Sequence, residues 1–140
     1  MAKGRVLVTL DCPIQKVWNT ITDFSDCDWR SDLSKVQIMD SSHFIEFTKN
    51  DVSTHFTITR KISYQKLCFT MENRYMKGQW IGNFKGNETH TTLDFLEEVQ
   101  PKLFLLRPFV GCYLRKQQFQ YFVDLKKELG CQEVGKNQIF

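Results

Sequence analysis

The chain has 140 residues, of which 41% are hydrophobic and 14% aromatic, and its formal net charge is +3. This length is typical of one domain and allows roughly two-thirds of the unfolded surface to be buried. The basic residues are scattered among acidic ones and form no block interleaved with aromatics, which argues against a nucleic-acid partner. We therefore expect a single domain over residues 1–140, with a core at 5–129 and a tail at 130–140. The 12 phenylalanines predict an interior lined by rings.

The cysteine content indicates reduced thiols. Their number is odd, no CxxC pair occurs and no spacing suits a metal; the five are Cys12, Cys27, Cys68, Cys112 and Cys131. The apolar stretch before Asp11 is too short for a signal peptide or a membrane span. We expect a cytoplasmic protein without stable membrane insertion, acting as a monomer or a weak homodimer.

The first elements follow from two periodicities. Alternating residues of period two over 5–10 predict a strand with Val6, Val8 and Leu10 on one face. Pro13 stands where a helix can begin, with Asp11 as a plausible cap, and apolar spacing continues this helix to Ile21. The segment 23–32, which contains Trp29, predicts a second short helix or an ordered loop.

A meander of six antiparallel strands is predicted up to Pro101. Its turns are placed at 41–42, 49–52, 64–65, 76–77 and 86–87. These turns pair Ile38 with Ile45, Val36 with Phe47, Arg60 with Phe69, Met71 with Gly82, and Trp80 with Leu93. Each pairing keeps large apolar residues on one face. The predicted inward set is Val36, Ile38, Ile45, Phe47, Phe56, Ile58, Ile62, Leu67, Phe69, Met71, Trp80, Phe84, Leu93, Phe95 and Val99. The predicted outward set is Glu46, His55, Thr57, Lys61, Glu72, Arg74, Lys85, His90 and Asp94.

A long helix is predicted over 108–129. Its apolar residues fall within one stripe, Gly130 is placed to end it, and residues 103–106 suit a preceding turn. The stripe contains Val110, Leu114, Tyr121, Phe122, Leu125 and Leu129. The predicted fold class is therefore α+β: a seven-stranded antiparallel sheet wrapped around a long C-terminal helix, with two short helices after the first strand.

The segment DCPIQKVWNTITDF, residues 11–24, followed by Trp29, resembles the opening of START/Bet v1-like sequences of the polyketide cyclase/dehydrase type. The long helix with LKKEL near its end is similar to the same helix-grip superfamily. The resemblance implies a cavity between sheet and helix. It leaves function open, because this superfamily includes lipid carriers, hormone and quinone binders, chaperone activators and cyclases.

The predicted inward face contains three polar residues, which we treat as candidate ligand contacts. A buried charge needs a partner, so Arg60 is a candidate anchor for a polar head group such as a carboxylate, with Glu97 and Asn73 near it. The alternative is that Arg60 and Glu97 reach solvent at strand ends, or pair with each other.

The predicted helix stripe adds Gln118, which could bind a ligand, or instead a backbone group or a buried water. Gly82 makes room among large side chains and suits a bulge or a close approach. Tyr121 could line the cavity or belong to the plain core. The apolar cavity candidates are Phe69, Met71, Trp80, Phe95 and Leu114.

Catalysis is less well supported than binding, although the sequence does not decide the point. His55 and His90 are predicted on the outer face and His43 beside a turn, and neither a nucleophilic triad nor metal-ligand spacing occurs. We expect no cofactor and no metal. The leading hypothesis is a binder of a small apolar or lipid-like ligand, for transport or sensing. The alternatives are a cyclase/dehydratase-like enzyme, or an interaction module like the Hsp90 activators, with an exposed apolar patch at Phe119 and Val123. These two residues lie off the main stripe of the helix with Cys112, and they could instead pack against the segment around Trp29.

Overall fold

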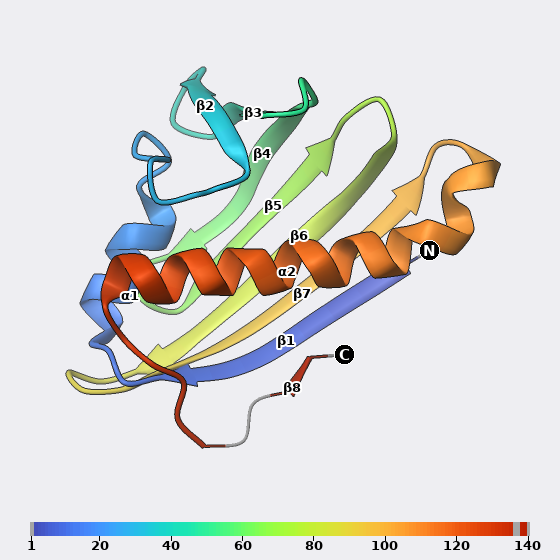
Figure 1. Ribbon diagram of the computed structural model, residues 1–140. Helices are drawn as coiled ribbons and strands as arrows, with labels where there is room; N and C mark the ends of the chain where they lie inside the picture. The colour runs from blue at the N-terminus through green and yellow to red at the C-terminus, as the bar shows by residue number, and fades with distance from the viewer. Residues whose placement is uncertain (1, 136–137, 140) are drawn as a thin grey trace.

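The computed structural model describes residues 2–135 and 138–139, and its architecture is α+β. One antiparallel sheet bends around a long helix, α2 (Figure 1). The strand order is β2-β3-β4-β5-β6-β7-β1-β8, so the meander β2–β7 closes onto β1. The elements are β1 Ala2–Leu10, α1 Ile14–Thr22, β2 Leu33–Ile38, β3 His43–Thr48, β4 Ser53–Ile62, β5 Lys66–Glu72, β6 Met76–Gly86, β7 Thr91–Pro101, η1 Phe104–Leu106, α2 Arg107–Leu129 and β8 Gln138–Ile139. The predicted seven-stranded sheet and long helix are confirmed, and β8 is a short addition beside β1.

The predicted apolar faces of β1 and α1 are buried as expected. On α1 these residues are Ile14, Val17, Trp18 and Ile21. The predicted cap is wrong, because Pro13 occupies the N-cap position and no side chain caps the helix. Asp11 instead accepts a hydrogen bond of 2.7 Å from the backbone N–H of Gln132, which ties the C-terminal segment to the end of β1.

The segment 23–32 forms turns rather than a second short helix. Asp23 accepts a hydrogen bond from the backbone N–H of Ser25, and Asp26 accepts one from Asp28, each at 3.2 Å. Such local bonds from aspartate compete with the helical pattern and favour turns. The segment is therefore an ordered loop, the other alternative predicted for it.

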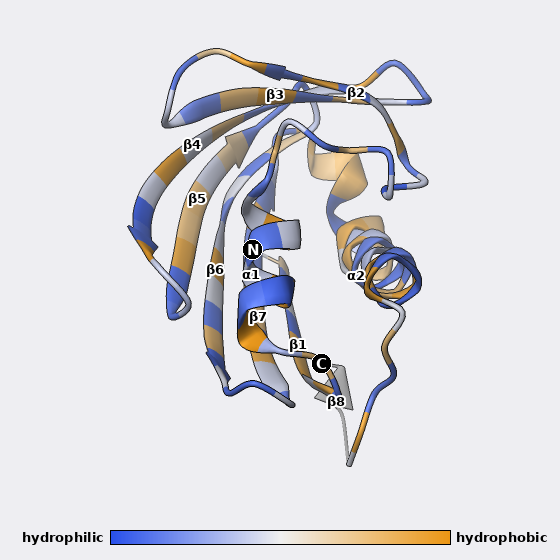
Figure 2. Ribbon diagram, turned by 90° about the vertical axis from the view of Figure 1, so that its left-hand side faces the viewer, coloured by the Kyte–Doolittle hydropathy of each residue, from blue (hydrophilic) through white to orange (hydrophobic). Residues whose placement is uncertain are grey.

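Helix α2 begins directly after the 3-10 turn η1 and ends at Gly130, as predicted. Gly130 has a φ of 64°, the left-handed conformation that terminates a helix and that glycine adopts without steric cost. Side on, α2 lies in the concave side of the sheet, and β2 and β3 curl over it (Figure 2). The side chains that it buries are Val110, Leu114, Gln118, Phe122, Asp124, Leu125 and Leu129.

The predicted register of β2 and β3 is wrong by one residue, which inverts the faces of β3. Ile38 pairs with Phe44 and Val36 with Glu46. The cause is the turn: Asp40 accepts hydrogen bonds from the backbone N–H groups of Ser42 and His43, and this stabilises a three-residue loop in place of a two-residue one. A shift of one residue moves every side chain to the other face. Phe44 and Glu46 therefore point inward, and Ile45 and Phe47 outward.

A bulge in β4 changes the faces at that strand's end. Ile58 pairs with Phe69, but Arg60 pairs with Cys68, so β4 holds one extra residue between these pairs. A bulge of this kind reverses which side chains point inward beyond it. Ile62 consequently leaves the predicted inward set.

The predicted registers of β5 with β6 and of β6 with β7 are each wrong by four residues, yet the predicted faces are correct. Phe69 pairs with Trp80, and Phe84 with Leu93. An even shift leaves each side chain on the same face because side chains alternate with period two. The inner wall was therefore predicted correctly even though its pairings were not.

Candidate functional site

A partly open cavity of about 170 Å³ lies between the inner face of the sheet and α2. This is below the roughly 300–1,000 Å³ usual for drug-sized ligands, so the enclosed space suits a small molecule. Its walls come from the 21–36 segment, strands β3 to β7 and the middle of α2.

The floor of the cavity is a run of aromatic rings across neighbouring strands. The ring centroids of Phe69 and Trp80 are 4.8 Å apart and stacked, and those of Trp80 and Phe95 are 4.6 Å apart. Phe56 adjoins Phe69 at 5.1 Å. Gly82 makes this packing possible, because a Cβ atom there would lie 2.6 Å from Cζ3 of Trp80. The rings pack against one another and together form an apolar wall of the cavity.

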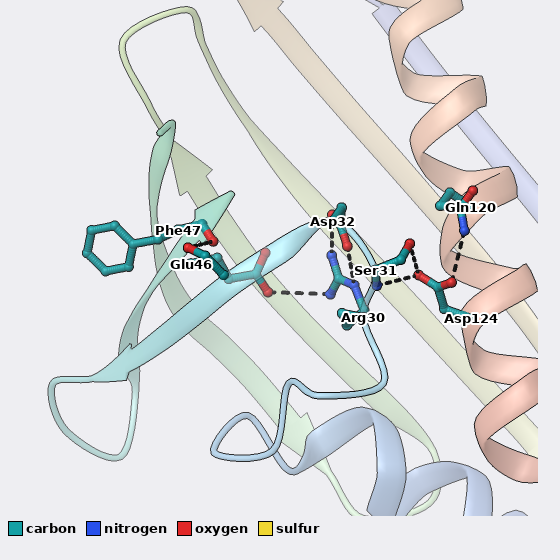
Figure 3. A network of polar contacts seen from close by, with 8 residues as sticks. Arg30, Ser31, Asp32, Glu46, Phe47, Gln120 and Asp124 are labelled. Atoms are coloured by element: carbon teal, nitrogen blue, oxygen red, sulfur yellow. Dashed lines mark hydrogen bonds and ion pairs between the residues drawn. The ribbon is translucent and has the colours of Figure 1, made fainter. Parts of the chain in front are cut away.

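A largely buried ion cluster closes one side of the cavity (Figure 3). Arg30 donates two hydrogen bonds of 3.0 Å to the carboxylate of Asp32 and forms an ion pair of 3.5 Å with Glu46. Its guanidinium carbon also lies 4.9 Å from the ring centroid of Tyr121, a cation–π distance. Burial raises the pKa of the Glu46 carboxyl, and Arg30 opposes that effect.

The loop that holds Arg30 is anchored to α2. Asp124, which is 7% exposed, accepts hydrogen bonds of 2.8 Å from both the backbone N–H and the hydroxyl of Ser31. Gln120 donates a third bond to the same carboxylate at 2.9 Å. Figure 3 follows this path from the loop to the helix. The contacts fix the position of Arg30 over the cavity.

Glu97 on β7 places a carboxyl group in the lining of the cavity. It pairs across the sheet with Trp80 on one side and Gly4 on the other, and so points inward. No hydrogen bond or ion pair engages its carboxyl within residues 2–135 and 138–139. Burial raises its pKa to about 7, with Glu46 adding to the effect and Arg30 opposing it. At neutral pH this carboxyl can therefore donate or accept a proton.

Gln118 on α2 presents an amide without a partner. The side chain is 6% exposed, and neither its amide nitrogen nor its oxygen has a hydrogen bond among the described residues. The amide rests against Gly4, where a Cβ atom would lie 2.9 Å from both of its polar atoms. A buried amide without hydrogen bonds costs about 1–3 kcal/mol, so Gln118 calls for a partner in the cavity.

Eight of the eleven candidate residues from the sequence meet at this cavity: Phe69, Met71, Asn73, Trp80, Phe95, Glu97, Gln118 and Tyr121. Their polar groups are not equally available. Asn73 accepts hydrogen bonds from the backbone N–H groups of Tyr75 and Met76 and donates one to Thr54. It is therefore occupied in the turn between β5 and β6, whereas Glu97 and Gln118 are available.

Arg60, Gly82 and Leu114 do not line the cavity. Arg60 is exposed on the outer face, because the bulge in β4 reverses its direction. The hypothesis that Arg60 anchors a head group in the cavity is therefore wrong, and the alternative, that Arg60 reaches solvent, agrees with the structure. Gly82 accommodates the ring of Trp80, and Leu114 packs with Val99 and Val110 in the core.

The main polar residues missed by the sequence analysis are Arg30, Asp32 and Glu46. Glu46 was assigned outward because Ile45 and Phe47 make the opposite face of β3 look like the apolar one. Arg30 and Asp32 lie in an irregular loop, where no periodicity indicates direction. The RSD tripeptide after Trp29 was the one available signal, since an arginine two residues from an aspartate can donate a bidentate pair of hydrogen bonds to its carboxylate.

The outer face of α2 exposes large apolar side chains, as predicted for the interaction alternative. Phe119 is 61% exposed and Val123 38%, so they do not pack against the segment around Trp29. The exposed side chains continue toward η1 with Phe109, Leu105 and Phe104.

Metal-ligand clusters and membrane-spanning helices are both absent from the described residues. No group of three or more His, Cys, Asp or Glu side chains is arranged to hold a metal ion there. None of the helices in that part of the chain combines the length and the apolar character needed to cross a membrane.

Comparisons with known proteins identify the fold. No family model matches the sequence, and no curated protein sequence does. A START superfamily protein from Mycobacterium smegmatis has a TM-score of 0.84 at 10% identity, over 93% of this chain and 98% of that one. A conserved protein from Geobacillus kaustophilus has a TM-score of 0.82 at 9% identity, over 95% and 99%. DynU16, from the dynemicin biosynthetic locus, has a TM-score of 0.73 at 13% identity, over 93% of this chain and 48% of that one. The chain therefore has a START-like helix-grip fold.

Proposed function

We propose that the protein binds a small, largely apolar molecule in the cavity between the sheet and α2. The observation that supports this best is the Gln118 amide, buried at the cavity with neither polar atom hydrogen-bonded. A ligand that supplies those hydrogen bonds would remove a cost that the empty protein bears. The aromatic floor at Phe69, Trp80 and Phe95 offers apolar contact for the remainder of the ligand.

Transport or sensing are roles that fit a binder with this fold. The likeness to a START superfamily protein, at 10% identity, is one of fold. All five cysteines are free thiols, which favours work in the reducing cytoplasm.

The test uses a neutral probe, 1-naphthalenemethanol, with one blocked variant and one matched control. Val36→Trp places a large ring on the cavity side of β2, whereas Gln37→Trp places the same ring on its exposed outer face. We expect the wild type and Gln37→Trp to bind one probe per chain, and Val36→Trp to bind at least tenfold more weakly. Circular dichroism checks that both variants are folded, and native mass spectrometry before and after solvent extraction looks for a co-purified compound. Equal binding by all three proteins would refute the proposal.

A second candidate is an enzyme of the cyclase or dehydratase kind, which the carboxyl of Glu97 favours. A pKa of about 7 is suited to general acid–base catalysis at neutral pH, and the group faces an aromatic cavity. Turnover of a bound compound should then depend on pH with a midpoint near 7 and be lost in Glu97→Gln. Bound compounds that are recovered chemically unchanged would leave only the binding role.

The exposed face of α2 favours a third candidate, a protein-interaction surface. Phe109 and Phe119 are 67% and 61% exposed. Several large apolar side chains exposed on one face are typical of an interaction surface, whereas single ones are common on any protein. Replacing both with serine should reduce self-association and leave probe binding unchanged. Static light scattering at rising protein concentration measures the self-association. Light scattering that reports the same monomer mass for the wild type and the variant at every concentration would count against self-association through this face.

A further inference from the structure

Charge is distributed unevenly around the cavity. Among the described residues that line it, one is cationic, Arg30. Three acidic side chains lie within the cavity, namely Asp32, Glu46 and Glu97, and three exposed ones lie at its rim, namely Asp23, Asp26 and Glu72. The whole chain, by contrast, has a net charge of +3. The cavity is therefore an acidic site in a basic protein, and its field favours cations.

The positive charge of Arg30 is already balanced by two carboxylates of the cavity. Arg30 Nε and Nη2 each donate to Asp32 at 3.0 Å, and Nη1 lies 3.5 Å from a carboxylate oxygen of Glu46. A ligand carboxylate would therefore meet the acidic side chains Asp32, Glu46 and Glu97 without an uncompensated cation among the described lining residues to offset them. Fatty-acid-like anions are consequently disfavoured.

Three unused features converge on one point of the cavity. Glu97 is directly opposite Trp80 in the sheet, so the two side chains lie on the same face, about 4.5–5.5 Å apart at their Cβ atoms. Glu97 is also opposite Gly4, against which the Gln118 amide rests. A carboxyl group, an amide without partners and the ring of Trp80 thus lie around the same space.

We propose that the ligand is an organic cation, an amine or ammonium group attached to an apolar body. The ammonium donates hydrogen bonds to Glu97 and to Oε1 of Gln118, beside the ring of Trp80. The apolar body covers Phe69 and Phe95. The inference rests on the proposed binding function and gives it a ligand class.

The binding is expected to depend on pH because Glu97 must be ionised to hold a cation. The charged and titratable groups that face it are Glu46 on β3, Arg30 in the 23–32 loop and Tyr113 on α2. Burial and Glu46 raise the pKa of Glu97 to about 7, so a large share of this carboxyl is protonated at pH 6. A cation should therefore bind more tightly at pH 8 than at pH 6.

The test compares probes that share one ring system and differ in charge. They are 1-naphthylmethylammonium, 1-naphthalenemethanol and 1-naphthaleneacetate, with the corresponding single-ring benzyl series in case the bicyclic ring is too large. Isothermal calorimetry with the full chain measures each Kd at pH 6 and pH 8. At pH 8 we expect the ammonium to bind at least tenfold more tightly than the alcohol and the carboxylate to bind most weakly. The advantage of the ammonium should shrink at pH 6.

Two variants locate the effect. Glu97→Gln should abolish the preference for the ammonium and change the Kd of the alcohol by less than a few-fold. Glu98→Gln, the next residue of β7 on the opposite face, should keep the preference. An alcohol that binds as tightly as the ammonium at pH 8 would overturn the inference and leave the binding function intact. If none of the probes binds, the binding function fails and the inference fails with it.

Discussion

Replacing Glu97 with glutamine should raise the stability of the protein relative to the wild type as the pH rises to neutral. The change keeps the shape of the side chain and removes an ionisable group whose pKa burial raises from 4.5 to about 7. Below pH 4.5 the carboxyl is protonated in both the folded and the unfolded chain. Between pH 4.5 and 7 the unfolded chain loses this proton while the folded chain retains it, so the wild type loses stability as pH rises.

The magnitude follows from the width of that pH window. Each pH unit corresponds to about 1.4 kcal/mol, so the whole window corresponds to at most about 3.5 kcal/mol. The contact that the carboxyl keeps with solvent through the cavity mouth reduces this value. Urea denaturation of the wild type and Glu97→Gln at several values between pH 4.5 and 8 measures it. The stability of the variant relative to the wild type should rise through the window and level off above pH 7.

A matched variant provides the opposite sign. Glu72 is exposed on β5, and its hydrogen bond with Lys102 lowers its pKa. The stability of Glu72→Gln relative to the wild type should therefore not increase as the pH rises. A difference between the wild type and Glu97→Gln that stays constant with pH would refute the reasoning, because it would mean that Glu97 titrates alike in the folded and unfolded chains.

Three further variants test the site. Gln118→Leu should raise the stability of the ligand-free protein by about 1–3 kcal/mol in thermal melts, since it removes a buried amide without partners, whereas Gln100→Leu on the exposed face should change little. Asp124→Ala should lower the stability by about 1–3 kcal/mol, because Ser31 loses both hydrogen bonds to α2. The same change should speed tryptic cleavage after Arg30, and unchanged cleavage would contradict the anchoring role. Gly82→Ala should cost about 1–3 kcal/mol and shift tryptophan fluorescence as the ring of Trp80 is displaced. Gly111→Ala meets nothing within 4 Å and should stabilise α2 by up to about 1 kcal/mol.

The sequence by itself determined the layers of the protein. The period of two in the strands and the helical stripe of 108–129 each depend only on near neighbours in the chain, so they can be seen without tertiary contacts. The aromatic floor at Phe56, Phe69, Trp80 and Phe95 was predicted correctly for the same reason. Those positions keep their face even when the register moves by four residues, and Glu97 and Gln118 were found because they interrupt these patterns.

Only the tertiary structure decided which charged groups enter the cavity. The carboxylate of Asp40 sets a three-residue turn, which brings Glu46 inside, and one extra residue in β4 sends Arg60 outside. Such one-residue changes are small in sequence, yet they reverse a face completely. Arg30 reaches the cavity through contacts with Asp32, Glu46 and α2 that lie far apart along the chain or in a loop without periodicity. The raised pKa of Glu97 likewise exists only when the sheet and α2 enclose it, because desolvation is a property of the packed interior.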